Sequence, residues 1–389
     1  MLLIGGALGS AVAGYFEDLW GRKTILIVNN LFYIVGSIVT ALAVNEGMLI
    51  AGRFIYGIGA GVATSVGPVY FNEISPSKLR GAVGALHEVS FNIGVLVSMI
   101  CGLFLSTVPN WRWLVAIPCI FSVLQLIMMP FSVQTPKWLV MKGDNKDSYV
   151  SLKLLHSSYS EGTLKREMAE ILDSQDPAAA EYKFWHIVTH PKLRVPLYVA
   201  IFFQVAQQFS GINAVYFYST SMFDETNPGI SSYMTLVIGI LSVLACAISA
   251  YLMDRAGRKL LSLIGLGGMC IIAVLFTIAF RFNIPGLSDF CIYGYVAFFS
   301  VSMGPIPFVI LPEYFPTQAV GDASSIAMVI NWLGGYVIGQ VFPLMSAGLG
   351  DYAFLPFAGF LAASFVIALI FIPETKGKPL PEILKDLGV

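Results

Sequence analysis

Three glutamines and an asparagine interrupt an otherwise apolar run that extends from about residue 195 to residue 222. Gln204, Gln207, Gln208 and Gly211 fall at i, i+3, i+4 and i+7, which predicts that they share one face of a helix. A run of this length can cross a bilayer, and uncharged amides at that depth need a polar partner. Either the amides bond neighbouring helices, or they bind a neutral, hydroxyl-rich solute whose groups match the donors and acceptors of an amide.

The composition excludes a soluble globular protein. Apolar residues make up 57% and charged residues 12% of the 389 positions, as expected of an integral membrane protein. The net charge is −1 and the charges lie between apolar runs, so nothing favours nucleic-acid binding. The five cysteines show no CxxC or Cys/His spacing, and no catalytic constellation stands out. We expect no metal site, no cofactor and no enzymatic activity.

The hydropathy pattern predicts eleven membrane-spanning helices and therefore an all-α, multi-pass protein in contact with the lipid bilayer. Most of the 22 Lys and Arg residues fall in loops on one side, which assigns that side and the carboxyl terminus to the cytosol. The predicted spans are approximately 1–16, 24–44, 48–71, 82–105, 113–133, 195–222, 231–253, 259–280, 290–311, 323–346 and 353–372.

Two of these spans are expected to be irregular. Gly211 lets its helix loosen, so that Asn213 beyond it need not keep a strict helical period and could turn inward. Pro305 and Pro307 cannot both keep helical hydrogen bonds, so we expect the span at 290–311 to be broken there.

The pattern Asp-x-x-Gly-Arg-Lys occurs twice, at residues 18–23 and at residues 254–259. Both copies follow a predicted span on the cytosolic side, which indicates a chain built of two similar halves. If the halves match helix for helix, one helix is missing before the first predicted span. The predicted organisation is an amino-terminal bundle at 1–134, a cytosolic helical linker at 135–194, a carboxy-terminal bundle at 195–373 and a cytosolic tail at 374–389.

Glycines and loop charges form a further pattern around the span at 48–71. Gly57 and Gly61 are spaced so that two helices can approach closely. Glu73 and Arg80 follow in the predicted cytosolic loop, where they could form ion pairs. The alternative is that these loop charges are only solvated.

Taken together, these motifs resemble the sugar porter family of the major facilitator superfamily. The Gln-Gln-x-x-Gly-x-Asn order at 207–213 is similar to the seventh helix of that family, and Gly304-Pro-Ile-Pro-Phe308 and Asn331-Trp332 have counterparts in order and spacing. The resemblance implies the major facilitator fold, with two pseudo-repeated helical bundles.

The resemblance also implies site residues. A substrate-binding set would comprise Gln207, Gln208, Asn213, Asn331, Trp332, Glu88 and Phe308. A cytosolic gate or latch would comprise Asp18, Arg22, Glu73, Arg80, Asp254, Arg258 and Glu313. Trp332 lies in mid-span, which suits stacking on a sugar ring, with plain helix packing as the alternative.

Several positions depart from the family pattern. Glu88 stands where the family has a glutamine and has no evident cation partner, so it is a candidate proton-binding site. Phe308 replaces a tryptophan, and Ser242 an asparagine that contacts sugar. Leu19 replaces a basic residue and Gln134 a glutamate, so we expect fewer ion pairs in the latch.

The expected function is transport of a monosaccharide, with a hexose as the first candidate, by alternating access as a facilitator or a proton symporter. Two alternatives stay open: a sugar sensor that does not transport, and a truncated, inactive product. The sequence does not separate a plasma-membrane from a vacuolar-membrane location, and the expected partners are the sugar, protons if transport is coupled, and the bilayer.

Overall fold

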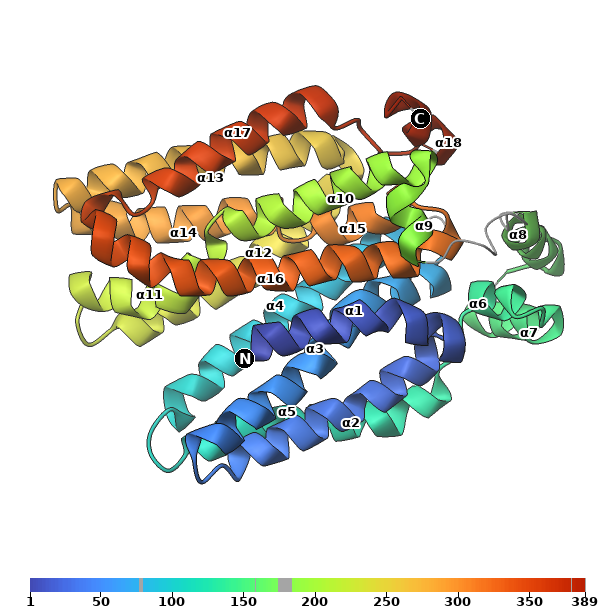
Figure 1. Ribbon diagram of the computed structural model, residues 1–389, viewed down its shortest axis with the longest axis horizontal. Helices are drawn as coiled ribbons and strands as arrows, with labels where there is room; N and C mark the ends of the chain where they lie inside the picture. The colour runs from blue at the N-terminus through green and yellow to red at the C-terminus, as the bar shows by residue number, and fades with distance from the viewer. Residues whose placement is uncertain (77–79, 158, 174–183, 379, 389) are drawn as a thin grey trace. The chain divides into compact units, whose positions relative to one another are not determined.

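The computed structural model describes residues 1–76, 80–157, 159–173, 184–378 and 380–388, and almost all of them are helical (Figure 1). The helices from the amino terminus through the linker are α1 (Leu2–Trp20), α2 (Arg22–Ala41), α3 (Glu46–Ile74), α4 (Arg80–Leu105), α5 (Trp111–Met128), η1 (Met129–Phe131), α6 (Pro136–Met141), α7 (Asn145–Leu155), α8 (Glu161–Asp173) and α9 (Phe184–Thr189). The remaining helices are α10 (Pro191–Phe209), α11 (Ile212–Thr226), α12 (Ser231–Ala256), α13 (Arg258–Arg281), α14 (Pro285–Val301), α15 (Ile306–Tyr314), α16 (Thr317–Leu349), η3 (Gly350–Tyr352), α17 (Leu355–Phe371) and α18 (Leu380–Asp386).

The chain folds into two compact units. The first unit comprises Met1–Gly84, Pro109–Leu197 and Leu311–Trp332. The second unit comprises Ala85–Val108, Tyr198–Ile310 and Leu333–Val389. The predicted boundaries between two sequence halves and a linker stay a prediction.

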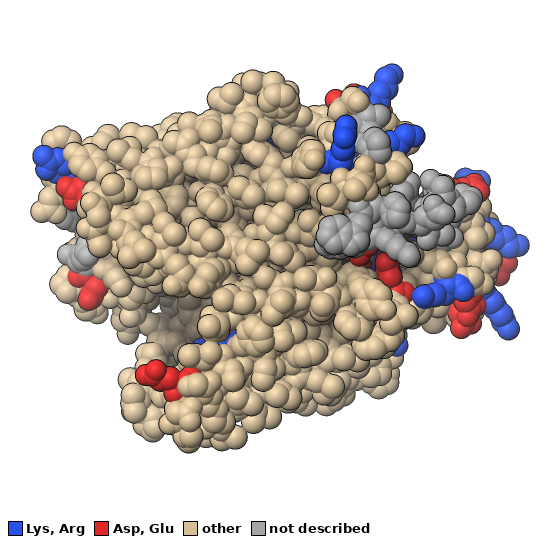
Figure 2. Space-filling view, in the orientation of Figure 1, with Lys and Arg blue, Asp and Glu red and all other residues tan. Residues whose placement is uncertain are grey.

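The apolar helices match the predicted spans. Within the described residues, nine helical segments are long and apolar enough to cross a membrane, and α17 is a shorter apolar helix. With α1, these segments coincide with all eleven predicted spans. Figure 2 shows charged side chains mainly at the ends of the molecule and an uncharged surface between them. Apolar side chains such as Ile370 and Phe371 of α17 are exposed. Such a surface suits lipid contact.

Close helix packing in the first unit depends on glycine. A Cβ atom on Gly61 of α3 would overlap the carbonyl oxygen of Gly6 in α1, and one on Gly57 would overlap the carbonyl oxygen of Leu2. Ser10 of α1 also donates a hydrogen bond to the carbonyl oxygen of Gly61 at 3.0 Å. The predicted close approach at Gly57 and Gly61 is therefore confirmed, with α1 as the partner helix.

Two predicted spans are each built of two helices. The span at 195–222 consists of α10 and α11, which are divided at Gly211 in a left-handed conformation (φ 85°). The span at 290–311 consists of α14 and α15, which are divided at residues 302–305. Both predicted irregularities are confirmed, and both breaks, at Gly211 and at residues 302–305, lie in the second unit.

Three short helices of the linker, α6, α7 and α8, share a small core of their own. Buried residues of α6, α7 and α8 pack together, namely Val140, Leu152, Leu164 and Met168. This core distinguishes the described helices α6 to α8 from an unstructured connection.

Candidate functional site

Glutamines of α10 form hydrogen bonds with backbone carbonyl groups at the break between α14 and α15. Gln207 donates from Nε2 to the carbonyl oxygens of Met303 at 2.9 Å and Gly304 at 3.1 Å. In a continuous helix, the carbonyl of Met303 would accept from residue 307, but Pro307 has no N–H group. The side chain of Gln207 thus supplies a donor that the helix itself lacks.

Gln204, which lies about one helical turn before Gln207 on α10, also bonds the α14–α15 break. Its Nε2 atom donates to the carbonyl oxygen of Pro307 at 3.3 Å, and its side chain is fully buried. For Gln204 and Gln207, bonding to a neighbouring helix, which was one of the two alternatives, is therefore observed.

The amide network continues toward less buried residues. Gln208 donates from Nε2 to Oε1 of Gln207 at 3.1 Å, and Asn213 donates from Nδ2 to Oε1 of Gln208. Gln207 is buried, whereas Gln208 and Asn213 are only partly buried. Asn213 follows the left-handed Gly211 and reaches back to an amide five residues earlier, and its predicted inward turn stays a prediction.

Glu88 lies beside the same break. Its side chain is buried, and its Oε1 atom accepts a hydrogen bond from Nδ2 of Asn92 at 3.4 Å. A Cβ atom on Gly304 would lie 3.5 Å from Oε1 of Glu88. Among the described residues, no ion pair involves Glu88. The structure thus brings a carboxyl group without a paired cation to within reach of the helix break that Gln207 closes.

Phe308 and Trp332, the predicted aromatic contacts, lie in different units. Phe308 stands edge to face with His87, with 6.1 Å between ring centroids in the second unit. Trp332 belongs to the first unit, where its Nε1 atom donates to Oγ1 of Thr64 at 3.1 Å. Asn331, also in the first unit, is partly buried.

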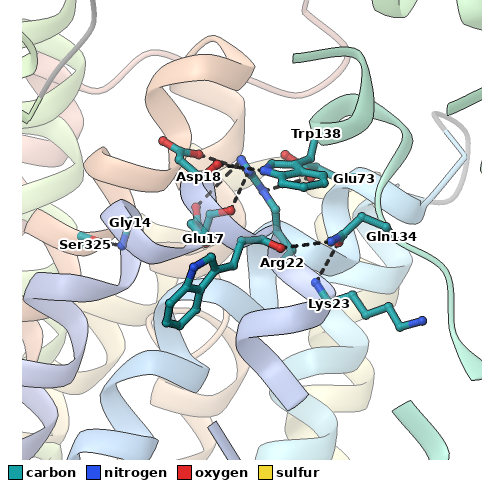
Figure 3. Close-up of polar contacts among 10 residues, drawn as sticks. Gly14, Glu17, Asp18, Arg22, Lys23, Glu73, Gln134, Trp138 and Ser325 are labelled. Carbon is teal, nitrogen blue, oxygen red and sulfur yellow. Dashed lines mark hydrogen bonds and ion pairs between the residues drawn. The ribbon is translucent and has the colours of Figure 1, made fainter. Parts of the chain in front are cut away.

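The predicted latch is built around Arg22, as Figure 3 shows. The Arg22 guanidinium lies 3.1 Å from Oδ1 of Asp18 and 3.2 Å from Oε2 of Glu73, so these three latch residues are brought together. Glu17 is a third carboxylate, 4.0 Å from Arg22. Arg22, Glu17 and the Glu73 side chain are buried, whereas the Asp18 side chain is 36% exposed, so a single cation faces two carboxylates away from water and a third that reaches solvent. Such a cluster is costly if every carboxylate is ionised.

Glu17 is the member that the sequence analysis missed. Neither of its carboxylate oxygens accepts a hydrogen bond from any described residue, and burial raises the pKa of Glu17 well above its ordinary value. Burial also raises the pKa of Asp18. The signal was available, because Glu17 stands where the second copy of the repeat has Met253, so the two copies differ by one buried acid.

The first helix of the latch also contacts α16 within the first unit. The amide N–H of Gly14 donates to Oγ of Ser325 at 2.8 Å, and a Cβ atom on Gly321 would overlap Oε1 of Glu17. Asp322 lies close enough to act electrostatically on Glu17. Glu17 therefore lies beside the acidic residue Asp322 and the backbone of α16.

The second copy of the repeat has the same local geometry. Gly21 and Gly257 both have positive φ, at 84° and 88°, and each is the N-cap residue of the helix that follows. Arg22 and Arg258 each donate from Nη1 to the carbonyl oxygen five residues earlier, at 3.3 and 3.1 Å. This agreement supports the internal repeat.

The residue that caps the following helix differs between the copies. Glu374 accepts from the backbone N–H groups of Arg258 and Lys259 at 2.9 and 3.1 Å, whereas Gln134 accepts from that of Lys23 at 2.9 Å. A carboxylate at a helix amino terminus is favoured by the helix dipole, and the neutral amide of Gln134 lacks this contribution.

Three further residues complete the predicted latch. The side chains of Arg80 and Asp254 lie outside the described residues. Glu313 is partly buried near the end of α15. Among the described residues, no group of three or more His, Cys, Asp or Glu is placed to hold a metal ion.

Comparison with known proteins identifies the family. The family model for sugar (and other) transporters matches residues 1–387. The human facilitated glucose transporter member 4 of solute carrier family 2 is 33% identical, over 98% of this chain and 77% of the relative. Member 1 from Gallus gallus is also 33% identical, over 98% of this chain and 80% of the relative.

Solved structures show the fold. The proton:xylose symporter XylE bound to 6-bromo-6-deoxy-D-glucose matches with a TM-score of 0.89 over 99% of this chain and 87% of that chain, at 24% identity. A partially occluded, inward-open structure of XylE from E. coli matches with a TM-score of 0.81 over 97% of this chain and 87% of that chain, at 25% identity. The chain therefore belongs to the sugar porter family of the major facilitator superfamily.

Proposed function

We propose that this protein carries a monosaccharide, with a hexose as the first candidate, across the membrane by alternating access. The observation that carries the proposal is the series of amides from Gln207 through Gln208 to Asn213, placed at one helix break and anchored to another. A transporter of this kind needs uncharged donors and acceptors in the membrane interior, and discontinuous helices are where such sites are built.

In this proposal, the buried and the partly buried amides have different roles. Gln204 and Gln207 are buried and bond backbone carbonyls, so their role in this proposal is to hold the α14–α15 break in shape. Gln208 and Asn213 are partly buried, and their amides can exchange bonds with a sugar hydroxyl. Asn331, Trp332 and Phe308 remain proposed contacts.

Glu88 is the proposed proton site. A protonated carboxyl group can donate a hydrogen bond to a sugar oxygen, as the amide of a glutamine would, and an ionised one cannot. Sugar affinity should therefore fall as rising pH removes this proton. Glu88→Gln should retain binding and remove that pH dependence, and a pH profile that is unchanged in Glu88→Gln would contradict the assignment.

For the clusters at Arg22 and Arg258 we propose the role of a latch on the predicted cytosolic side. Arg22 holds residues of α1 and α3 together through Asp18 and Glu73, and Glu374 holds the end of α17 against the start of α13. Ion pairs and caps of this type can open and re-form without covalent chemistry, as a gating step requires.

Sugar binding by purified protein, measured by isothermal titration calorimetry against a panel of hexoses and pentoses, tests the proposal. We expect saturable binding of at least one monosaccharide and a weakening of about tenfold in Asn213→Ala, the loss of about one well-formed hydrogen bond to a polar ligand.

Asn227→Ala is the matched control. Asn227 follows the last residue of the same helix and bonds Thr226 and Asp289, so its loss should leave sugar affinity unchanged. Absence of binding to every monosaccharide by folded protein would refute the proposal. Binding without transport would favour the sensor alternative.

A further inference from the structure

Thr64 of α3 holds the polar edge of Trp332. The indole N–H donates to Oγ1 of Thr64 at 3.1 Å. The same oxygen lies 3.1 Å from the carbonyl oxygen of Ala60 and 3.0 Å from that of Gly61. A threonine hydroxyl has one proton and two lone pairs, so its proton goes to the α3 backbone and a lone pair is left for the indole. The bond therefore has a fixed direction.

Gly6 of α1 holds the ring face of Trp332. A Cβ atom on Gly6 would lie 2.6 Å from Cε3 and 2.8 Å from Cε2 of the indole, and would overlap Cδ2. The backbone of Gly6 has no positive φ, so this glycine is needed for space and not for conformation. One face of the indole thus packs flat on the α1 backbone.

All three residues belong to the first unit, so the contact joins α1, α3 and the first half of α16. Trp332 itself is only partly buried. With its N–H bonded to Thr64 and one face on Gly6, what the indole has left to offer a ligand is its remaining ring surface.

We propose that Thr64 and Gly6 are positioning residues that fix Trp332 so that it recognises a sugar through its ring face and not through its N–H group. This inference rests on the proposed function, because it assumes that Trp332 contacts the sugar. A ring fixed before binding does not lose side-chain freedom when the sugar arrives, and so contributes more affinity than a mobile ring. The ring face matches the C–H surface of a pyranose.

A double-mutant cycle on sugar affinity separates this role from plain packing. Thr64→Val keeps the shape of the side chain and removes the acceptor, and we expect about 3- to 10-fold weaker binding, as for one lost hydrogen bond. Thr64→Ser keeps the hydroxyl and should restore wild-type affinity. In a Trp332→Phe background, which has no N–H group, Thr64→Val should have no further effect.

Several outcomes would overturn the inference. These are unchanged affinity in Thr64→Val, equal losses in Thr64→Val and Thr64→Ser, or an undiminished Thr64→Val effect in the Trp332→Phe background. If the wild-type protein binds no monosaccharide, the proposed function fails first. If it binds and the cycle shows no coupling, only the positioning role fails.

Two further measurements keep the test independent of folding defects and of the choice of sugar. The indole ¹H–¹⁵N signal of Trp332, assigned by its absence in Trp332→Phe, should shift in Thr64→Val without any sugar, and an unmoved signal would contradict the hydrogen bond. Ring-face recognition also predicts that Trp332→Phe, which keeps an aromatic face, binds sugar far better than Trp332→Ala. Equal loss in both variants would contradict it.

Discussion

Gln207→Ala, compared with Gln204→Ala, tests how the amide face of α10 works. Gln207 makes two hydrogen bonds to carbonyls of the α14–α15 break and accepts one from Gln208. Gln204 donates to the carbonyl oxygen of Pro307 over a longer distance, 3.3 Å. Both are removed by the same substitution from the same helix face, so Gln204→Ala is a matched control for buried amide loss.

The expected magnitude follows from these bonds. Removing Gln207 leaves the carbonyl of Met303 without the donor that Pro307 cannot supply, and it releases Gln208. Leaving buried polar groups unpaired costs about 1 to 3 kcal/mol, which corresponds to roughly 5- to 150-fold weaker sugar binding if the loss falls on the bound state. For Gln204→Ala we expect less than about fivefold weaker sugar binding, because its bond to Pro307 is longer and a side-chain hydrogen bond in a membrane bundle contributes about 0.6 kcal/mol on average.

The assay is calorimetric sugar affinity together with the thermal unfolding midpoint of each variant in detergent. We expect Gln207→Ala to weaken binding well beyond Gln204→Ala, and the unfolding midpoints report how much of the lost hydrogen bonding also stabilises the sugar-free protein. Equal effects of the two variants on affinity, or no effect of Gln207→Ala, would refute this reasoning. The glutamines would then serve helix packing alone.

Three further predictions concern packing, protonation and orientation. Gly61→Ala should destabilise the protein by about 1 to 3 kcal/mol in thermal unfolding, because α1 must move away from the new Cβ atom. Gly94→Ala is the control and should not destabilise the protein, because the space around its Cβ position is open. Equal unfolding midpoints of the two variants would contradict the close packing. Burial raises the pKa of Glu17, so the folded protein keeps a proton on this side chain that an exposed Glu17 would lose. The stabilisation by the buried, protonated carboxyl group is therefore complete below the ordinary pKa of a glutamate and is lost as the pH rises through the raised pKa of Glu17. Glu17→Gln should flatten the fall of the unfolding midpoint with rising pH, and the same slope in the variant would exclude Glu17 as its source. Cysteines introduced into the loop at 224–231 should react with an impermeant reagent only from the non-cytosolic side of the membrane, and a cysteine at Val389 only from the cytosol. The reverse pattern would overturn the predicted orientation.

Helix positions and their irregularities could be predicted because they are local properties. Gly211 and the proline pair at 305 and 307 mark breaks through their own backbone chemistry, and the apolar runs set the spans by length. Gly57 and Gly61 indicated a close neighbour, but only the structure shows that this neighbour is α1.

Contacts between residues that are far apart in the sequence could not be predicted. Thr64 and Trp332 are 268 positions apart, and nothing in either segment points to the other. The glutamines on α10 share a face in the sequence pattern, yet their division into buried amides that bond a backbone and partly buried ones depends on where α14 breaks against them. Glu17 could have been found by comparing the two copies of the repeat, where it opposes Met253.

Counterflow in proteoliposomes tests the central claim most directly. Purified protein is reconstituted into vesicles loaded with an unlabelled hexose, and uptake of the same radiolabelled hexose is followed. The account predicts saturable uptake above that of protein-free vesicles, recovery of the sugar unchanged, and a strong reduction in Asn213→Ala but not in Asn227→Ala. Uptake by folded wild-type protein that equals that of empty vesicles, for every monosaccharide that the protein binds, would contradict transport.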